Sequence, residues 1–261
     1  MMQRITSALV LLPLVLGAAY VGGPAFAAVV GVAALIAGYE LFRMARSLGH
    51  RPSYVAGLGV IAALILDAYR PNMGLGRWAL IFAAGGYLTW QVFHKEGRGF
   101  IYDWSIVLAG AVYVGGLAGH MVLLRNLPRG LDWLLFTFLV TWTCDSAAFL
   151  VGSLSGRHPF FAHVSPKKTV EGAIGGFVVG IALGTLVGQY MGMALWQAFA
   201  LSTLLVLGST FGDLSESVLK RQVGVKDSGS LIPGHGGMLD RIDSLLFAGA
   251  ITYYFVIWVL S

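Results

Sequence analysis

The sequence predicts an all-α, polytopic integral membrane protein with about nine transmembrane helices. Of its 261 residues, 57% are hydrophobic and only 11% are charged, whereas a soluble domain carries about 25% charged residues. The apolar residues fall in blocks of roughly 17 to 24, the length that crosses a ~30 Å hydrocarbon core as a helix. These blocks do not alternate as barrel strands would. The chain therefore belongs in a bilayer.

The expected spans leave no room for a soluble domain. Residues 1–130 hold the N-terminal helices, and residues 131–261 hold the C-terminal helices with the chemical motifs, in one membrane domain. At the start, Ala25-Phe26-Ala27 also resembles a signal-peptide cleavage site, and its cleavage would remove one span without changing the rest. The expected spans lie near 5–21, 25–44, 53–69, 77–93, 101–124, 131–152, 169–191, 195–217 and 244–260, with ends accurate to several residues.

The placement of Lys and Arg predicts the orientation. If the N-terminus is cytoplasmic, 13 of them lie in inside segments and 4 outside, as the positive-inside rule requires. We therefore expect a multi-pass inner-membrane protein whose N-terminus and basic loops face the cytoplasm. The net charge of +5 is explained by this bias, so no nucleic-acid partner is expected. The inside residues are Arg4, Arg43, Arg46, Arg51, Lys95, Arg98, Arg157, Lys167, Lys168, Lys220, Arg221, Lys226 and Arg241; the outside ones are Arg70, Arg77, Arg125 and Arg129.

One expected span carries a stripe of glycines. In 169–191, glycine recurs at every fourth position from Gly172 to Gly188. This spacing puts all of them on one helix face, where a neighbouring backbone can approach closely. We interpret the stripe as a packing surface. The lone cysteine, Cys144, excludes an intramolecular disulfide and is also interpreted as a packing residue.

Ionisable groups inside spans are costly and usually face a polar cavity. Glu40 lies deep in its span, and its residue type fits helix pairing and function equally well. Asp145 and Asp213 lie near the cytoplasmic ends of their helices, beside the most basic loops. After Asp213, the residues Glu216, Ser217 and Lys220 follow on one helical stripe. This stripe resembles the wall of an aqueous site, although an ordinary Glu216–Lys220 pair at i,i+4 is the alternative.

The segment 222–243 favours the active-site interpretation. Its glycines let backbone amides approach a ligand, and Asp240 and Asp243 share a face if the last span begins there. Two such carboxylates repel unless a cation or proton intervenes, and oxygen ligands favour Mg²⁺. Carboxylates, basic side chains and a glycine-rich loop are typical of phosphoryl or nucleotidyl transfer.

The loop 153–168 adds a second phosphate-binding candidate. Ser165-Pro166 is a suitable N-cap followed by proline at the first helical position. Lys167 and Lys168 follow, and a helix N-terminus with two lysines favours phosphate. Alternatively, the two lysines are only orientation signals.

With these residues in view, the stretch from Ser217 to Asp243 resembles the signature of the phosphatidate cytidylyltransferase family: a Ser, then Lys-Arg, Lys-Asp, a Pro before His-Gly-Gly, and Asp-Arg-x-Asp. Two further family features begin at Asp145 and at Ser165, with departures at Ser146 and Val170. The resemblance covers roughly residues 140–260.

The resemblance implies that phosphatidic acid attacks the α-phosphorus of CTP in a cytoplasm-facing polar cavity, giving CDP-diacylglycerol and pyrophosphate with Mg²⁺. A second cation and a homodimer are left open. The expected catalytic residues are Lys220, Arg221, Lys226, Asp227, His235 and Arg241; the substrate-binding residues are Ser165, Lys167, Lys168, Thr169, Glu171, Glu216, Ser217, Gly236 and Gly237; the metal ligands are Asp213, Asp240, Asp243 and, more weakly, Asp145.

Three other functions are alternatives to cytidylyl transfer. A CTP-dependent lipid or polyprenol kinase would use a similar site but would transfer the γ-phosphoryl group. A CDP-alcohol phosphotransferase is disfavoured because its Asp-Gly-x-x-Ala-Arg core is absent. A transporter would explain the carboxylates within spans but not the loop 222–243, and no inverted repeat is evident.

Overall fold

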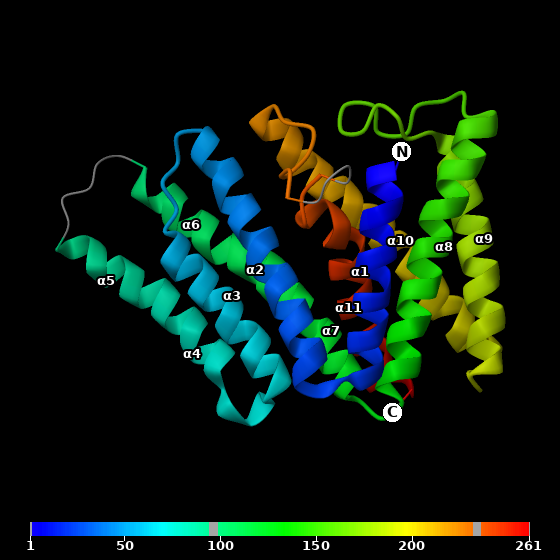
Figure 1. Ribbon diagram of the computed structural model, residues 1–261, viewed down its shortest axis with the longest axis horizontal. Coiled ribbons are helices and arrows are strands. Elements are labelled where there is room, and N and C mark those ends of the chain that lie inside the picture. Colours follow the sequence, from blue (N-terminus) through cyan, green and yellow to red (C-terminus); the bar gives the residue numbers. More distant parts are fainter. Residues whose placement is uncertain (1, 94–98, 232–235, 261) are drawn as a thin grey trace.

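The protein is a bundle of helices, as the sequence predicts (Figure 1). The computed structural model describes residues 2–93, 99–231 and 236–260, and no strand is formed within these ranges. The helices are α1 (Met2–Val21), α2 (Gly23–Ser47), α3 (Tyr54–Tyr69), α4 (Leu75–Ile81), α5 (Tyr87–Val92), α6 (Phe100–Ala111), α7 (Leu117–Asn126), α8 (Gly130–Ser155), α9 (Val170–Tyr190), α10 (Leu195–Val223) and α11 (Leu239–Phe255). Short π-helical segments join α4 to α5 (Phe82–Gly86) and α6 to α7 (Val112–Gly116), and another extends α11 (Val256–Leu260).

The helices are long and apolar enough for a membrane protein that crosses the bilayer several times. Within the described ranges, 6 helices meet the length and hydropathy expected of a membrane span: α2, α6 joined to α7, α8, α9, α10, and α11 with its extension. The remaining expected spans are also helical, but α3 and the apolar part of α1 are shorter, and α4 and α5 meet at a π-helical segment. The number of nine crossings therefore stays a prediction.

The outer surface of the bundle is apolar. Phe149 is 78% exposed, Tyr190 is 93% exposed and Trp258 is 75% exposed. Exposed large apolar side chains on this scale are unfavourable in water and suit a hydrocarbon environment.

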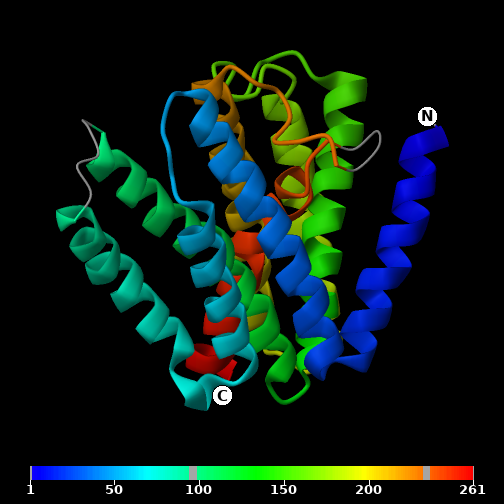
Figure 2. The same cartoon turned by 60° about the vertical axis from the view of Figure 1, so that its left-hand side comes forward.

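The connections fall at two ends of the bundle (Figures 1 and 2). The start of α1, the α2–α3 loop, the α8–α9 loop and the described part of the α10–α11 loop lie at one end. The α1–α2 turn, the α3–α4 and α7–α8 connections, the α9–α10 turn and the end of the chain lie at the other. The described basic loops that are expected to be cytoplasmic thus share one end, which we call the basic end; Lys95 and Arg98 lie outside the described residues. Which compartment this end faces stays a prediction.

Two apolar clusters form the core, and three helices, α2, α7 and α11, contribute to both. One cluster gathers buried residues mainly from α1, α7, α8, α10 and α11, and the other mainly from α2, α3, α7 and α11. On α11, Leu246 belongs to one cluster and Ala248 to the other. Because α11 also carries Asp240 and Asp243, the N-terminal helices help to fix the position of these carboxylates.

The glycine stripe of α9 is a packing surface, as predicted. All five of its glycines are buried. A Cβ at Gly176 would lie 2.8 Å from the Cys144 carbonyl oxygen of α8, and one at Gly180 would lie 2.8 Å from Val206 of α10. Such distances are too short for real contacts, so glycine lets α9 lie directly against both neighbours.

Candidate active site

The polar stripe of α10 forms as predicted, because α10 continues to Val223 rather than ending near residue 217. Lys220 forms an ion pair with Glu216, one turn earlier, so the alternative of an i,i+4 pair is also realised. The Glu216 side chain is fully buried, and its Oε1 has no hydrogen-bond partner among the described residues. Ser217 Oγ lies 3.4 Å from Asp213 Oδ1, which is a long hydrogen bond.

Asp240 lies at the centre of a saturated buried network. Helix α11 begins at Leu239, earlier than the expected residue 244, so Asp240 and Asp243 both belong to it. Lys220 Nζ donates to Asp240 Oδ1 at 2.6 Å. Asp240 Oδ2 accepts from Ser228 N at 3.0 Å, Ser228 Oγ at 3.1 Å and Gly237 N at 2.8 Å. The side chain is only 6% exposed, and four donor atoms surround its oxygens, of which Ser228 Oγ shares its one hydrogen between Asp240 and Glu40.

Three other carboxylates form a second group with fewer partners. Asp243, which is buried, interacts electrostatically with Asp213 and Asp145. Its Oδ1 accepts a hydrogen bond from the neighbouring Ser244 N at 2.6 Å. Lys168 Nζ lies 2.6 Å from Asp213 Oδ2, in a pair whose side chains are 29% and 32% exposed. Like charges that interact in this way repel unless a cation or a proton intervenes.

The α8–α9 loop is tied to the start of α9. The helix N-cap is Thr169, whose hydroxyl accepts from Gly172 N at 3.2 Å. The N-cap predicted at Ser165 is therefore wrong: Lys168 N instead closes a turn onto the Ser165 carbonyl, which places both lysines before the helix.

Glu171, expected to bind substrate, organises the same loop. It accepts hydrogen bonds from Arg157 N at 3.0 Å and His158 N at 3.2 Å, and pairs with the His158 ring. Its carboxylate therefore fixes the backbone that precedes the two lysines.

Several predicted phosphate-binding cations remain accessible. Lys167, Lys226 and Arg241 are exposed and form no ion pair with another described residue. Arg221 is exposed, but its guanidinium donates to the Val164 and Val225 carbonyls, which ties α10 to the α8–α9 loop. Asp227 is exposed beside Lys226.

The fold brings only some of the predicted metal-binding residues and the predicted residues of the loop 222–243 close to one another. Among the residues that the structure describes, no group of three or more His, Cys, Asp or Glu has an arrangement that could hold a metal ion. Gly236 and Gly237 lie against Asp240, and Gly236 has a φ of 80°, which favours glycine. His235 lies outside the described residues.

The sequence analysis missed residues that the fold brings to this site. Ser228 bridges Glu40 and Asp240 through its hydroxyl group. Tyr113 interacts electrostatically with Asp243, Glu216 and Asp213, and its buried hydroxyl group has no hydrogen-bond partner among the described residues. Tyr113 is more than 95 positions from Asp213 in the sequence, so no local motif could have indicated it.

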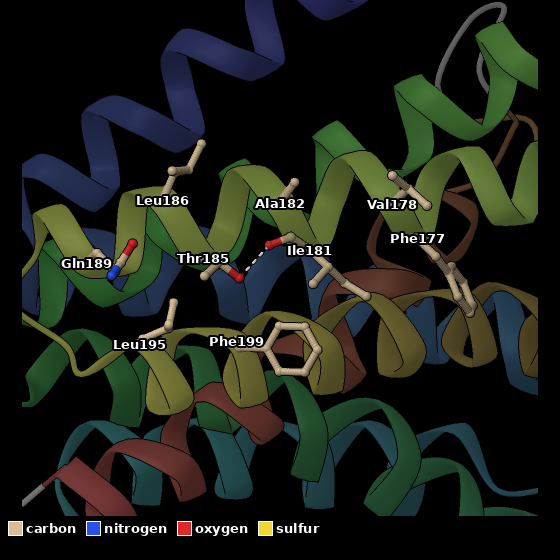
Figure 3. Close-up of a pocket in the computed structure, with 9 residues that line it drawn as sticks. All are labelled: Phe177, Val178, Ile181, Ala182, Thr185, Leu186, Gln189, Leu195 and Phe199. Atoms are coloured by element: carbon tan, nitrogen blue, oxygen red, sulfur yellow. Dashed lines mark hydrogen bonds between the residues drawn. The ribbon is translucent and has the colours of Figure 1, made fainter.

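A separate groove lies on the apolar outer face, between α9 and α10 (Figure 3). It has a volume of about 590 Å³ and includes none of the predicted site residues. Thr185 lines it but donates its hydroxyl group to the Ile181 carbonyl at 2.7 Å. The lining has few polar groups that could bind a nucleotide. The candidate active site is therefore the cluster of Asp213, Glu216, Lys220, Asp240 and Asp243, which we call the polar cluster.

Comparison with known proteins adds an independent finding. The model of the cytidylyltransferase family matches residues 2–259. A Synechocystis protein named phosphatidate cytidylyltransferase is 32% identical over 99% of this chain and 97% of its own length. Proteins of the same name from Staphylococcus aureus and Staphylococcus saprophyticus are 33% and 36% identical over 94% and 75% of this chain, and over 94% and 75% of their own lengths. The similarity therefore includes the N-terminal helices as well as the motifs.

Proposed function

The chain belongs to the cytidylyltransferase family, and we propose that it joins CTP to phosphatidic acid to give CDP-diacylglycerol and pyrophosphate. It is a nucleotidyltransferase of phospholipid synthesis, in a membrane environment that suits its lipid substrate. The observation that carries the proposal is the match over residues 2–259, which includes every described carboxylate and cation of the polar cluster.

The reaction is a displacement at phosphorus. A phosphate oxygen of phosphatidic acid forms a bond to the α-phosphorus of CTP, and the bond between this phosphorus and the oxygen bridging to the β-phosphorus breaks. Pyrophosphate leaves with the bond electrons. The attacking phosphate is already anionic at neutral pH, so no general base is assigned. Catalysis then depends on holding two anionic substrates together and on neutralising their charge.

We assign Mg²⁺ binding to Asp213 and Asp243, with Asp145 as the third carboxylate nearby. Two carboxylates with few partners fit Mg²⁺, which usually binds through one or two carboxylates, several waters and the substrate phosphates. When bound, the ion would neutralise the phosphate oxygens of CTP. Asp240 is assigned a supporting role, because four donors already occupy its oxygens.

The cations around these carboxylates would bind phosphate groups. Lys167, Lys226 and Arg241 are exposed without ion pairs to described residues, so their charges are available to CTP, pyrophosphate or the lipid phosphate. Lys168 is paired with Asp213. This pair keeps a phosphate-binding cation beside a metal-binding carboxylate, which suits a nucleotide that carries its own Mg²⁺.

We also propose that the basic end faces the cytoplasm, where CTP is found. Single cysteines at Ser155 and Ser230, both exposed at this end, would test this in a Cys144→Ser background. In sealed cells, an impermeant thiol reagent added outside should label neither. Labelling of either cysteine would reverse the orientation.

The reaction itself is tested with purified protein, phosphatidic acid in detergent micelles, Mg²⁺ and labelled CTP. Label at the α-phosphate should enter the lipid, and label at the γ-phosphate should leave as pyrophosphate. Transfer of the γ-label to the lipid would instead indicate a kinase. An Asp243→Asn variant, which is matched in volume, serves as the inactive control.

A further inference from the structure

Among the described residues of the N-terminal half, Glu40 is the carboxylate that forms hydrogen bonds to the segment between α10 and α11 and to the start of α11. It lies on α2, far from every motif in the sequence, yet its side chain is 4% exposed. Its Oε1 accepts from Met238 N at 3.0 Å. Its Oε2 accepts from Leu239 N at 2.9 Å and from Ser228 Oγ at 2.9 Å. Both carboxylate oxygens of Glu40 are thus used to hold Ser228, Met238 and Leu239.

Two of these bonds replace a missing helix cap. The first amide groups of any helix lack partners within the helix, and Met238, at the N-cap position of α11, provides no side-chain cap. Glu40 supplies the acceptor from another helix. A negative charge at this end of α11 also complements the helix dipole. Glu40 therefore fixes where α11 begins, and with it the positions of Asp240 and Asp243.

The glycines of the loop make this contact possible. A Cβ at Gly229 would collide with Glu40 Oε1, and a Cβ at Gly237 would collide with Ser228 Oγ and Glu40 Oε2. Neither glycine has a positive φ among the described residues, so close approach is the reason for glycine at both positions. Gly229 and Gly237 both lie against the carboxylate of Glu40. These two glycines are therefore explained by the contact with Glu40 rather than by substrate binding.

Ser228 connects Glu40 to the rest of the site. Its hydroxyl group lies 2.9 Å from Glu40 Oε2 and 3.1 Å from Asp240 Oδ2, while Asp240 receives Lys220 at 2.6 Å. We propose that Glu40 is a positioning residue for cytidylyl transfer, which acts through Ser228 and the start of α11 on the catalytic carboxylates. The inference rests on the proposed function.

The test measures steady-state transfer from α-labelled CTP to phosphatidic acid by wild type, Glu40→Gln, Ser228→Ala and the double variant. Glutamine keeps the volume but offers only one acceptor oxygen, so it cannot receive both Met238 N and Leu239 N. We expect kcat to fall about 10- to 100-fold, as displaced catalytic groups do, with a KM for CTP within about three-fold of wild type. Amide hydrogen exchange should become faster at residues 238–239 and stay unchanged in α9.

The double variant separates positioning from general loss of structure. If Ser228 transmits the effect of Glu40, the double variant should be at most about two-fold slower than Glu40→Gln, since coupled residues are not additive. Asp67→Asn, an isosteric change near the C-terminal end of α3 at the opposite end of the bundle, is the matched control and should keep wild-type turnover. All variants are assayed well below their melting temperatures.

Three results would overturn the inference: wild-type kcat/KM in Glu40→Gln, unchanged hydrogen exchange at 238–239, or an additive loss in the double variant. If Glu40→Gln does not fold, Ser228→Ala decides alone, with an expected loss of about 3- to 10-fold for one hydrogen bond, and unchanged activity rejects the inference. If wild type transfers no label to lipid, the proposed function fails instead. The two failures are therefore distinguishable.

Discussion

Two carboxylate groups lie at the basic end of this bundle, and they differ in how many partners they have. Asp240 is 6% exposed and has four donors around its oxygens. Asp213 is 32% exposed, with one lysine and one long bond from a serine. A carboxylate whose oxygens already accept several hydrogen bonds has few lone pairs left to bind a ligand, whereas a carboxylate with few hydrogen bonds can still bind one. Among the predicted metal ligands, Asp240 therefore fits the proposed supporting role and Asp213 fits the proposed substrate-facing role.

We expect the largest loss of stability when the charge of Asp240 is removed. Asp240→Asn leaves Lys220 with only the buried Glu216 as a partner, and breaking a buried pair costs about 3–5 kcal/mol. We expect a loss of this size in the free energy of unfolding, measured by denaturation in mixed micelles. Wild-type stability in this variant would contradict the supporting role and return Asp240 to the candidate metal ligands.

The substrate-facing carboxylates should show the opposite pattern. Asp213→Asn and Asp243→Asn should each lower turnover by about 10²- to 10³-fold, because an electrostatic group that stabilises the transition state is lost. Their stability should be unchanged or higher, since mutual repulsion is relieved. Turnover across a Mg²⁺ titration, with thermal melting as the folding control, checks both. Normal turnover with an unchanged Mg²⁺ requirement would remove that residue from the proposed site.

Variants of Lys168 and Lys226 test whether these lysines bind the phosphate groups of the substrates. Lys168→Ala and Lys226→Ala should each lower kcat/KM by about 10- to 10²-fold, the value of a charge-assisted contact to phosphate. The partly exposed Lys168–Asp213 pair should contribute only about 1 kcal/mol to stability, so melting temperatures should barely change. If both variants keep wild-type kinetics, the lysines are orientation signals only.

The smallest effect is expected at Ser217. Its hydroxyl group is 3.4 Å from Asp213 Oδ1, so Ser217→Ala removes one weak bond, worth about 0.5–1.5 kcal/mol at most. The expected loss of kcat/KM is less than about ten-fold. A larger loss would show that Ser217 contacts the substrate directly, as the sequence motif suggests.

The sequence predicts the fold well because hydrophobic blocks and glycine spacing are local signals. Every expected span is helical where the structure describes it, and the stripe from Gly172 to Gly188 packs as predicted. The errors lie at helix ends. Thr169 rather than Ser165 caps α9, because the bonds that Glu171 makes to residues 157 and 158 hold the preceding loop in a turn.

The sequence predicts a list of site residues, but it does not predict which of them the fold surrounds with hydrogen-bond donors. Asp240 and Asp243 are three positions apart in one motif, yet one is saturated and the other is not. Asp240 receives its hydrogen bonds from Lys220, Ser228 and Gly237, and Ser228 is in turn bonded to Glu40 across 188 positions of sequence. Contacts of this range depend on tertiary packing, and a motif does not contain them.

One feature at the opposite end of the bundle bears on how the chain assembles during synthesis. Arg125, at the end of α7, donates to the Ala19 carbonyl at 2.6 Å and to the Tyr20 carbonyl at 3.1 Å, and so holds the end of α1. The first of these bonds joins residues 106 positions apart. Translation adds about 5–20 residues per second, so Arg125 is synthesised on the order of 5–20 s after Ala19. An Arg125→Gln variant should leave the α1–α2 turn open to protease, and a wild-type cleavage rate in that variant would show that α1 is held by other contacts. Helix α1 is thus secured by this contact only after α7 has been synthesised.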